Sequence, residues 1–285
     1  MKKLSLLAAI CLMMNALNGM SQTTDAWPWD FPMSTGEQLT DGELILAPYT
    51  YYKVAIDDKE DLKRKGLIFY KTKLETAGSE KSVVNYMEDY ELPNSLIIGI
   101  PEGVIAKKGD VLLTWWQSGS GLKRAIVRDD SNPAEPKVDY LDMDMRLDND
   151  GAISGLAERN ANEQLKPNSF IVLRDGEWAP GAQVACKNER DEWNAATLIK
   201  ATKDKVLVSG FSSRLSVYPK DDCRLIPMSD EDMKAGDTVW CVWVGTYQSG
   251  YTVDKVDKER GRVWVTDSRG NHKILSILEV TKVLD

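Results

Sequence analysis

The sequence predicts an all-β fold, a tandem array of about four small barrel-like units. Two observations predict it: short runs of alternating apolar and polar residues separated by polar turns, and a closing segment that recurs along the chain. The closing segments are 92–98, 166–172, 218–226 and 274–280. Because a few short strands in roughly 50 to 70 residues cannot make a stable flat sheet, we expect each unit to close into a barrel.

Each unit is expected to open with a strand, in most cases after a glycine turn, and to continue with a second strand that begins with an aromatic residue or leucine. The opening strands are 41–46, 109–113, 181–186 and 236–241, and the second strands are 51–56, 122–127, 193–198 and 251–256. In the second strands one apolar position falls out of phase, which predicts a bulge or twist.

A third strand follows a polar turn, and the closing segment ends the unit. The third strands are 67–70, 138–141, 206–208 and 263–265. In the closing segments a proline followed by an Asn or Asp is typical of a tight turn before an apolar pair.

These patterns divide the chain into six segments. We expect a signal peptide at 1–21, an extended aromatic segment at 22–40, and four units at 41–103, 104–176, 177–229 and 230–285. The aromatic segment contains Trp27, Trp29 and Phe31 interleaved with Pro28 and Pro32. It is either a strap docked over a unit or a ligand presented to another protein.

The N-terminus predicts export from the cytoplasm. Lys2 and Lys3 precede the apolar run 4–17, and Gly19 and Ser21 are small residues at the positions that favour cleavage before Gln22. Lipidation of Cys11 is disfavoured because this cysteine lies inside the apolar run and follows bulky Ile10. We therefore expect a periplasmic or secreted protein, not a lipoprotein, with no integral membrane segment after cleavage.

The charge balance argues against nucleic acid as a partner. The chain has 36 Lys and Arg against 44 Asp and Glu, a net charge of -8. Removal of Lys2 and Lys3 would leave 34 against 44, a net charge of -10. An acidic surface with scattered basic residues repels phosphate backbones.

The third unit carries a family resemblance. Its segments 184–185, 193–198, 205–208 and 223–227 together resemble a Tudor or agenet-type barrel of the Src-homology-3-like fold. The fourth unit lacks the closing Arg and Pro of that pattern, and the first two units contain longer insertions. The resemblance implies a groove lined by aromatic residues that binds a peptide, in some members through a methylated lysine or arginine held by cation–π attraction.

Five aromatic residues are candidates for such a binding surface: Trp193, Trp115, Trp116, Trp243 and Tyr251. Trp193 occupies the tryptophan position of the family pattern, where it either packs on its own hairpin or contacts a ligand. Trp115 and Trp116 are adjacent on a predicted strand, so they point to opposite faces. The outward ring is either a contact residue or a plug against the neighbouring unit.

In a barrel of this family the opening and closing strands are neighbours, which has a consequence for the cysteines. Cys186 lies on the opening strand of the third unit and Cys223 on its closing strand, so a disulfide between them is one alternative. The other is three buried, unpaired thiols, since Cys186, Cys223 and Cys241 lack metal-ligand spacing. Cys241 is expected to be free in both.

No catalytic or cofactor motif is present. His272, the only histidine, falls in a predicted turn with no evident partner to orient it. The carboxylate pairs Asp142/Asp144 and Asp221/Asp222 are of a kind that chance produces in an acidic chain. The segment 148–151 is similar to the core of a calcium loop but lacks the anchoring carboxylates at both ends. We expect no metal, no cofactor and no enzymatic activity.

The sequence thus indicates a non-catalytic extracytoplasmic binding or scaffolding protein, with a protein or a cell-envelope glycan as its partner. One alternative is a repeat protein that binds cell-wall peptidoglycan. Another is a hydrolase that uses a pair of carboxylates.

Overall fold

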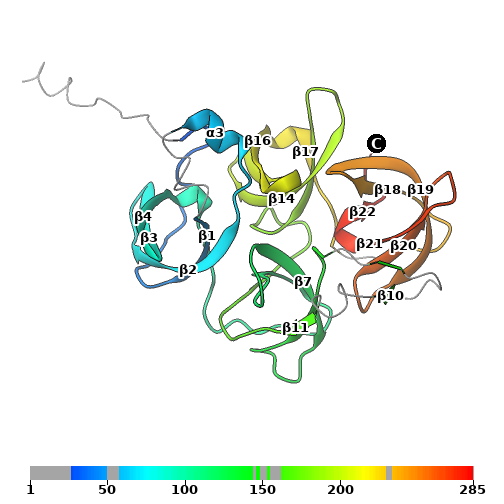
Figure 1. Ribbon diagram of the computed structural model, residues 1–285, viewed down its shortest axis with the longest axis horizontal. Helices are drawn as coiled ribbons and strands as arrows, with labels where there is room; N and C mark the ends of the chain where they lie inside the picture. The colour runs from blue at the N-terminus through cyan, green and yellow to red at the C-terminus, as the bar shows by residue number, and fades with distance from the viewer. Residues whose placement is uncertain are drawn as a thin grey trace, which may run out of the picture.

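The computed structural model describes residues 27–49, 58–143, 146–147, 153–154, 162–228 and 233–284. The predicted signal peptide, the predicted strand 51–56 and the segment 148–151 lie outside these residues. The all-β expectation is confirmed, since antiparallel strands make up most of the regular structure (Figure 1). Among the helices that the structure describes, none is long and apolar enough to span a bilayer.

Twenty of the described strands form four groups of five, and the pairing of Asn194 with Thr246 joins the third and fourth groups into one ten-stranded sheet. The first group consists of β1 (Leu44–Pro48), β2 (Phe69–Thr76), β3 (Lys81–Tyr86), β4 (Glu88–Pro93) and β5 (Ile98–Gly99). The second consists of β6 (Val111–Trp115), β7 (Leu122–Asp129), β8 (Lys137–Tyr140), β11 (Asn162–Gln164) and β12 (Ile171–Val172), with the separate pair β9 (Arg146–Leu147) and β10 (Ile153–Ser154).

The third group consists of β13 (Gln183–Lys187), β14 (Trp193–Ala201), β15 (Lys205–Ser209), β16 (Leu215–Pro219) and β17 (Cys223–Leu225). The fourth consists of β18 (Thr238–Trp243), β19 (Thr246–Asp257), β20 (Arg262–Thr266), β21 (His272–Ser276) and β22 (Val280–Thr281). The short helix α3 (Lys59–Arg64) precedes β2, and the carboxylate of Asp58 caps it by accepting hydrogen bonds from the amides of Glu60 and Asp61.

All four groups have the same strand order. Numbered along the chain within each group, the strands lie in the order fourth, third, second, first, fifth. In each group the register of the second strand shifts where it pairs with the third, after Leu74, Val127, Leu198 and Val253. Such a bulge bends the second strand, so that it can pair with the first strand and with the third while the sheet curves.

The prediction of closed barrels is wrong at the level of backbone pairing. Among the described residues no ladder joins the fourth and fifth strands of any group, so the two ends of each sheet stay unpaired. The reason lies in the connection between them. The chain passes from the fourth strand to the fifth through a single short turn, and the fifth strand then pairs with the first strand alone, over two or three residues.

The predicted tight turns in the closing segments are present. Three of them are 3-10 turns: η1 (Asn94–Leu96), η3 (Lys220–Asp222) and η4 (Ile277–Glu279). In the first, buried Asn94 donates from Nδ2 to the carbonyl of Gly78 and accepts from Ser82 Oγ at 2.7 Å. The asparagine side chain therefore holds the turn against the preceding hairpin.

The four groups surround a common centre and share buried contacts. In Figure 1 the first group lies at the left, the third at the top, the fourth at the right and the second at the bottom. One cluster of buried apolar residues draws members from every group, among them Phe69, Leu113, Leu207 and Val263. The four groups thus pack against one another through a shared core and are not separate modules joined by linkers.

A chain of buried polar groups crosses three of the four groups. Arg124 on β7 is held by Asp142, with its Nε 2.9 Å from Asp142 Oδ2, and its Nη1 donates to Gln183 Oε1 on β13 at 2.6 Å. Gln183 Nε2 then donates to the hydroxyl of Tyr247 on β19 at 3.0 Å, and Tyr247 donates to the carbonyl of Leu278 at 3.1 Å. Arg124, Gln183 and Tyr247 each donate to an acceptor in this series of hydrogen bonds. Their burial therefore does not cost the free energy of an unsatisfied donor.

The fourth group also contacts the second directly. Arg262 on β20 is 1% exposed, and its guanidinium donates to the carbonyls of Tyr140 and Leu141. Gly261, just before it, has a φ of 59°, and a Cβ there would lie 2.8 Å from Leu141 Cδ2. A larger residue at position 261 would force these two groups apart.

Of the two alternatives for the aromatic N-terminal segment, the structure shows the strap: its described residues are docked on the strand groups. Trp29 is 8% exposed and Phe31 is 5% exposed, and Trp29 Nε1 donates to the carbonyl of Leu215 on β16. The amide of Ser95 donates to the carbonyl of Met33. The segment therefore joins the first group to the third instead of projecting from the surface.

Replacing Asp142 with asparagine tests the polar chain. The variant leaves the buried Arg124 guanidinium without its counterion, so we expect it to lose about 3 kcal/mol of unfolding free energy at neutral pH. Burial opposes ionisation of Asp142, but attraction and hydrogen bonds from Arg124 outweigh it and lower the pKa of that carboxyl. The ionised form thus stabilises the fold above the ordinary Asp pKa of about 3.9, and this contribution disappears as the pH falls below that value.

Urea unfolding from pH 7 to pH 2 measures this effect. The difference between wild type and Asp142→Asn should be constant down to about pH 5 and shrink below pH 4. Exposed Asp221 provides the control, because Asp221→Asn removes the same charge without a buried partner. A pH-independent difference for Asp142→Asn would contradict the role given to this ion pair.

The structure joins Cys186 and Cys223 by a disulfide between β13 and β17, with Cα atoms 4.2 Å apart, while Cys241 is free and buried. Burial raises the pKa of the Cys241 thiol to about 12, so it stays protonated at neutral pH. We expect thiol titration under denaturing conditions of a chain that begins at Gln22, and so lacks Cys11, to find one free thiol per chain. Three free thiols would rule the bridge out.

Candidate functional site

A groove in the fourth group brings together two of the predicted binding residues. It has a volume of 580 Å³ and lies between the β18–β19 hairpin and the turn that joins β20 to β21. Its lining residues are Trp243, Gln248, Ser249, Gly250, Tyr251, Asp267, Ser268, Arg269, Asn271 and Lys273.

The turn between β20 and β21 is built around one carboxylate. Asp267 Oδ1 accepts from the amides of Arg269 and Asn271, both at 2.9 Å, and Oδ2 accepts from Asn271 Nδ2 at 2.8 Å. Gly270, with a φ of 83°, completes the tight bend. The Asn271 side chain and the two amides, with a smaller contribution from the charge of Lys273, lower the pKa of Asp267, so this carboxylate is ionised and is bound mainly by its own turn.

An aromatic pair in the groove holds a lysine of the same chain. The Nζ of Lys273 lies 3.7 Å from the ring centroid of Trp243 and 4.9 Å from that of Tyr251. It also donates a hydrogen bond to the Tyr251 hydroxyl at 3.1 Å. Trp243 is 50% exposed and Tyr251 only 7%, so the tryptophan presents the larger ring surface to solvent.

Two cations of the groove have no ion-pair partner among the described residues, namely Lys273 and Arg269. Arg269 is exposed and Lys273 half-buried. Neither ring of the aromatic pair carries a formal charge, and Asp267 directs its oxygens to its own turn. The groove thus offers positive charge on a chain whose net charge is -8.

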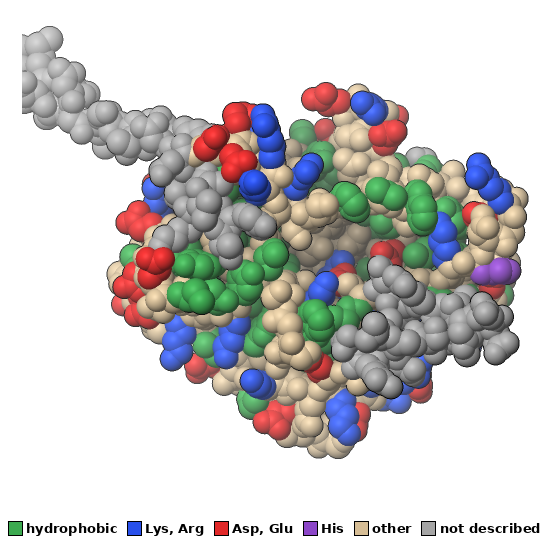
Figure 2. Space-filling model, viewed as in Figure 1, with side chains coloured by type: hydrophobic (Ala, Val, Ile, Leu, Met, Phe, Trp, Pro, Cys, Tyr) green, Lys and Arg blue, Asp and Glu red, His purple; other side chains and the backbone are tan. Residues whose placement is uncertain are grey.

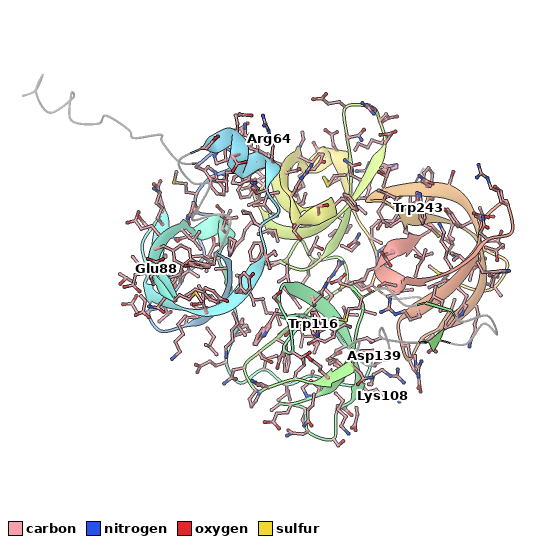
Figure 3. The ribbon with its side chains drawn as sticks, in the orientation of Figure 1. Arg64, Glu88, Lys108, Trp116, Asp139 and Trp243 are labelled. Carbon is pink, nitrogen blue, oxygen red and sulfur yellow. A yellow bond between two sulfur atoms is a disulfide. The ribbon has the colours of Figure 1, made fainter. Side chains whose placement is uncertain are left out.

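An exposed apolar surface continues from the groove. Phe211 is 62% exposed, Val244 62% and Trp243 50%, and a Cβ built on Gly245 would lie 2.6 Å from Phe211 Cβ. Figure 2 shows apolar side chains gathered over the region of β18 and β19 where Figure 3 labels Trp243. We call Phe211, Trp243 and Val244 the apolar patch.

The backbone under the apolar patch is in a costly conformation. Val244 has a φ of 49° and Gly245 a φ of 79°, and they form the two-residue connection between Trp243 and its partner Thr246. A hairpin of this kind favours Asn or Asp before glycine, because a β-branched residue with positive φ is strained. The chain therefore places an exposed valine where a polar residue would be more stable, a combination that occurs at functional sites.

The remaining predicted binding residues lie elsewhere. Trp193 is 6% exposed, carries Lys187 over its ring at 5.0 Å, and packs with Tyr247 between the third and fourth groups. Trp115 is 9% exposed in the shared core, and Trp116 packs against the core of the second group. None of these three tryptophans lines the groove of the fourth group.

His272 has neighbours that sequence reasoning missed. It begins β21, and its Nδ1 lies 2.8 Å from Thr266 Oγ1 and 3.4 Å from Asp254 Oδ2. The expectation that it has no partner to orient it is wrong, because β20 and β19 bring both residues beside it. The ring is exposed, and among the described residues no cluster of three or more His, Cys, Asp and Glu could hold a metal ion.

A second cavity, of 300 Å³, lies where the first three groups meet. Its lining includes Phe69, Leu113, Ser209 and the Arg124–Asp142 pair. Both charges are already engaged in the polar chain described above, so this cavity offers a ligand fewer unpaired groups than the groove.

The comparisons with known proteins do not assign the chain to a family. No protein-family model matches it, and no curated protein gives a match.

Sequence reasoning missed Lys273, Arg269 and Phe211 as members of the site. Lys273 and Arg269 flank the lone histidine in a segment that looks like a solvated turn, and Phe211 belongs to a different unit from Trp243. One local signal was available: the Val-Gly pair at 244–245 stands where a hairpin favours Asn-Gly.

Replacing Val244 with asparagine should stabilise the protein. Asparagine tolerates positive φ, so we expect Val244→Asn to gain about 1 kcal/mol of unfolding free energy, measured by urea denaturation. Val283, 48% exposed outside this turn, is the matched control, and Val283→Asn should stay within about 0.5 kcal/mol of wild type. A destabilised Val244→Asn would show that the valine contributes to the fold itself.

Proposed function

We propose that this chain is a non-catalytic extracytoplasmic binding or scaffolding protein whose fourth strand group contacts the ligand through the groove. The observation that carries the proposal is the half-exposed indole of Trp243, fixed beside Tyr251 and Lys273 in a groove of 580 Å³. Tryptophans with a large exposed ring in such settings commonly dominate binding energy.

We also infer that the four groups are open, curved five-stranded sheets of the Src-homology-3-like, Tudor type. The common strand order, the bulge in each second strand and the short turn before the last strand support this inference. In the fourth group Trp243, Tyr251 and Lys273 lie on strands β18, β19 and β21, and the connection between β20 and β21 completes the groove.

The contacts between groups favour a scaffold over a flexible chain of modules. The polar chain from Arg124 to Tyr247 and the strap at Trp29 hold neighbouring groups in one arrangement. A groove on such a body is pre-organised, which lowers the entropy lost when a ligand binds.

The state of the carboxylates supports the non-catalytic part of the proposal. A hydrolase that uses two acids requires one with a raised pKa to donate a proton. Asp142 is bonded to Arg124, which lowers the pKa of this carboxyl, so Asp142 does not have the raised pKa that such an acid requires. Asp144 lies outside the described residues.

Binding to two probes tests the proposal: purified peptidoglycan sacculi and a synthetic library of linear peptides. With either as the ligand, we expect Trp243→Ala to weaken binding about tenfold or more, since loss of an interface tryptophan typically costs over 1 kcal/mol. Solubilised ligand should also shift the indole resonance of Trp243 in a ¹⁵N-labelled protein.

Trp264 provides the matched control, because Lys255 lies 4.8 Å over its ring in the same group, outside the groove. Trp264→Ala should leave binding unchanged. Ligand binding that survives Trp243→Ala, or the absence of binding to both probes, would overturn the proposal. Binding to sacculi alone would favour the cell-wall alternative for the same groove.

A further inference from the structure

The aromatic pair of the groove is already filled by a cation. Lys273 lies over Trp243 and Tyr251 at 3.7 and 4.9 Å and donates to the Tyr251 hydroxyl. A lysine or methylated lysine from a ligand would have to displace this ammonium, break that hydrogen bond and approach Arg269. The cage-like ligand mode implied by the sequence resemblance is therefore opposed by the chain's own side chains.

The same contacts leave positive charge available to an anion. An ammonium has three donors, and the hydrogen bond to Tyr251 uses one. The π faces stabilise the cation without neutralising it, and Arg269 adds a second, exposed cation. Asp267, the acidic residue of the lining, already accepts three hydrogen bonds from its own turn. A carboxylate entering the groove would meet two cations with no ion-pair partner among the described residues.

The apolar patch narrows the class of anion. Trp243 lines the groove together with these cations and is half exposed, and Val244, which follows it at the tip of the hairpin, is exposed as well. Phe211, also exposed, lies against Gly245 of the same hairpin. The side chains of Phe211 and Val244 offer the hydroxyl groups of a sugar acid no hydrogen-bond partner, although Gln248, Ser249 and Asn271 in the groove do. A peptide can place an apolar side chain there and a carboxylate beside it.

We propose that the ligand of the groove is an acidic peptide segment, with its carboxylate paired to Lys273 and Arg269 and a neighbouring apolar side chain packed on Phe211, Trp243 and Val244. This proposal rests on the groove being the binding site, and it names the chemistry of the ligand. The net charge of -8 opposes non-specific attraction of such a segment to the chain as a whole.

Three capped synthetic peptides of the same length serve as probes. The first alternates leucine and glutamate, the second alternates leucine and glutamine, and the third alternates leucine and trimethyl-lysine. We expect the glutamate peptide to bind the mature wild-type chain about tenfold more tightly than the glutamine peptide, and to shift the Trp243 indole resonance. The trimethyl-lysine peptide should bind more weakly than either.

Variants of the lysine separate charge from shape. Lys273→Met removes the ammonium and keeps an unbranched side chain, so it should abolish the preference for glutamate over glutamine, while Lys273→Arg should retain it. Lys255→Met is the matched control, because Lys255 stacks on Trp264 outside the groove, and it should behave as wild type. The urea midpoint of each variant verifies that it is folded.

Two results would overturn the proposal while the groove remained the binding site. One is tighter binding of the trimethyl-lysine peptide, above all if Lys273→Met improved it, since that would make Lys273 a displaceable plug. The other is a Trp243 shift with sacculi and with none of the three peptides. If no probe of either kind bound or moved the Trp243 resonance, the binding role of the groove would fail as well.

Discussion

The Arg124 guanidinium is the interaction on which the arrangement of the four strand groups depends. It is buried, its charge is balanced by Asp142, and its remaining donor reaches Gln183 in the next group. Gln183 passes the connection to Tyr247 in the fourth group. A buried guanidinium without these acceptors would cost several kcal/mol, so the polar chain permits only the arrangement that completes it.

The shared apolar core would tolerate small rotations of one group against another, because apolar contacts carry little directional preference. The polar chain and the Arg262 contacts to the carbonyls of Tyr140 and Leu141 do not, since hydrogen bonds weaken steeply with angle. The strap at Trp29 and Phe31 adds a further restraint between the first and third groups. The result is a ring of groups with a defined face, and the groove of the fourth group lies on a fixed support.

Several residues of the groove and of its hairpin are in environments or conformations that are less stable than those of the surrounding structure. The Trp243 ring is left half exposed, Val244 adopts a positive φ, and Lys273 forms no ion pair at contact distance with any described residue. Each departure has a small energetic cost that a polar or smaller residue would remove. Their concentration around one hairpin, on an otherwise well-paired fold, is the reason to assign the binding role there.

Local patterns in the sequence were sufficient to predict strands, closing turns and bulges of this protein. The alternation in segments such as 138–141 and 206–208, the closing turns at Pro93 and Pro219, and the out-of-phase position that becomes a bulge all depend on residues close in the chain. The cysteine pair was one of two open alternatives, because spacing alone cannot show which strands are neighbours. The expectation of closed barrels failed because closure depends on whether two edge strands meet, which no local pattern encodes.

Only the tertiary structure decided which polar groups meet. Arg124 and Gln183 are 59 residues apart and Gln183 and Tyr247 are 64 apart, and none of them lies in a motif. The same holds for Lys273, which reaches Trp243 because β21 and β18 belong to one curved sheet, and for Phe211, which the third group brings against Gly245. Hydrophobic periodicity specifies which face of a strand is buried, while the partners of a side chain depend on how whole sheets pack.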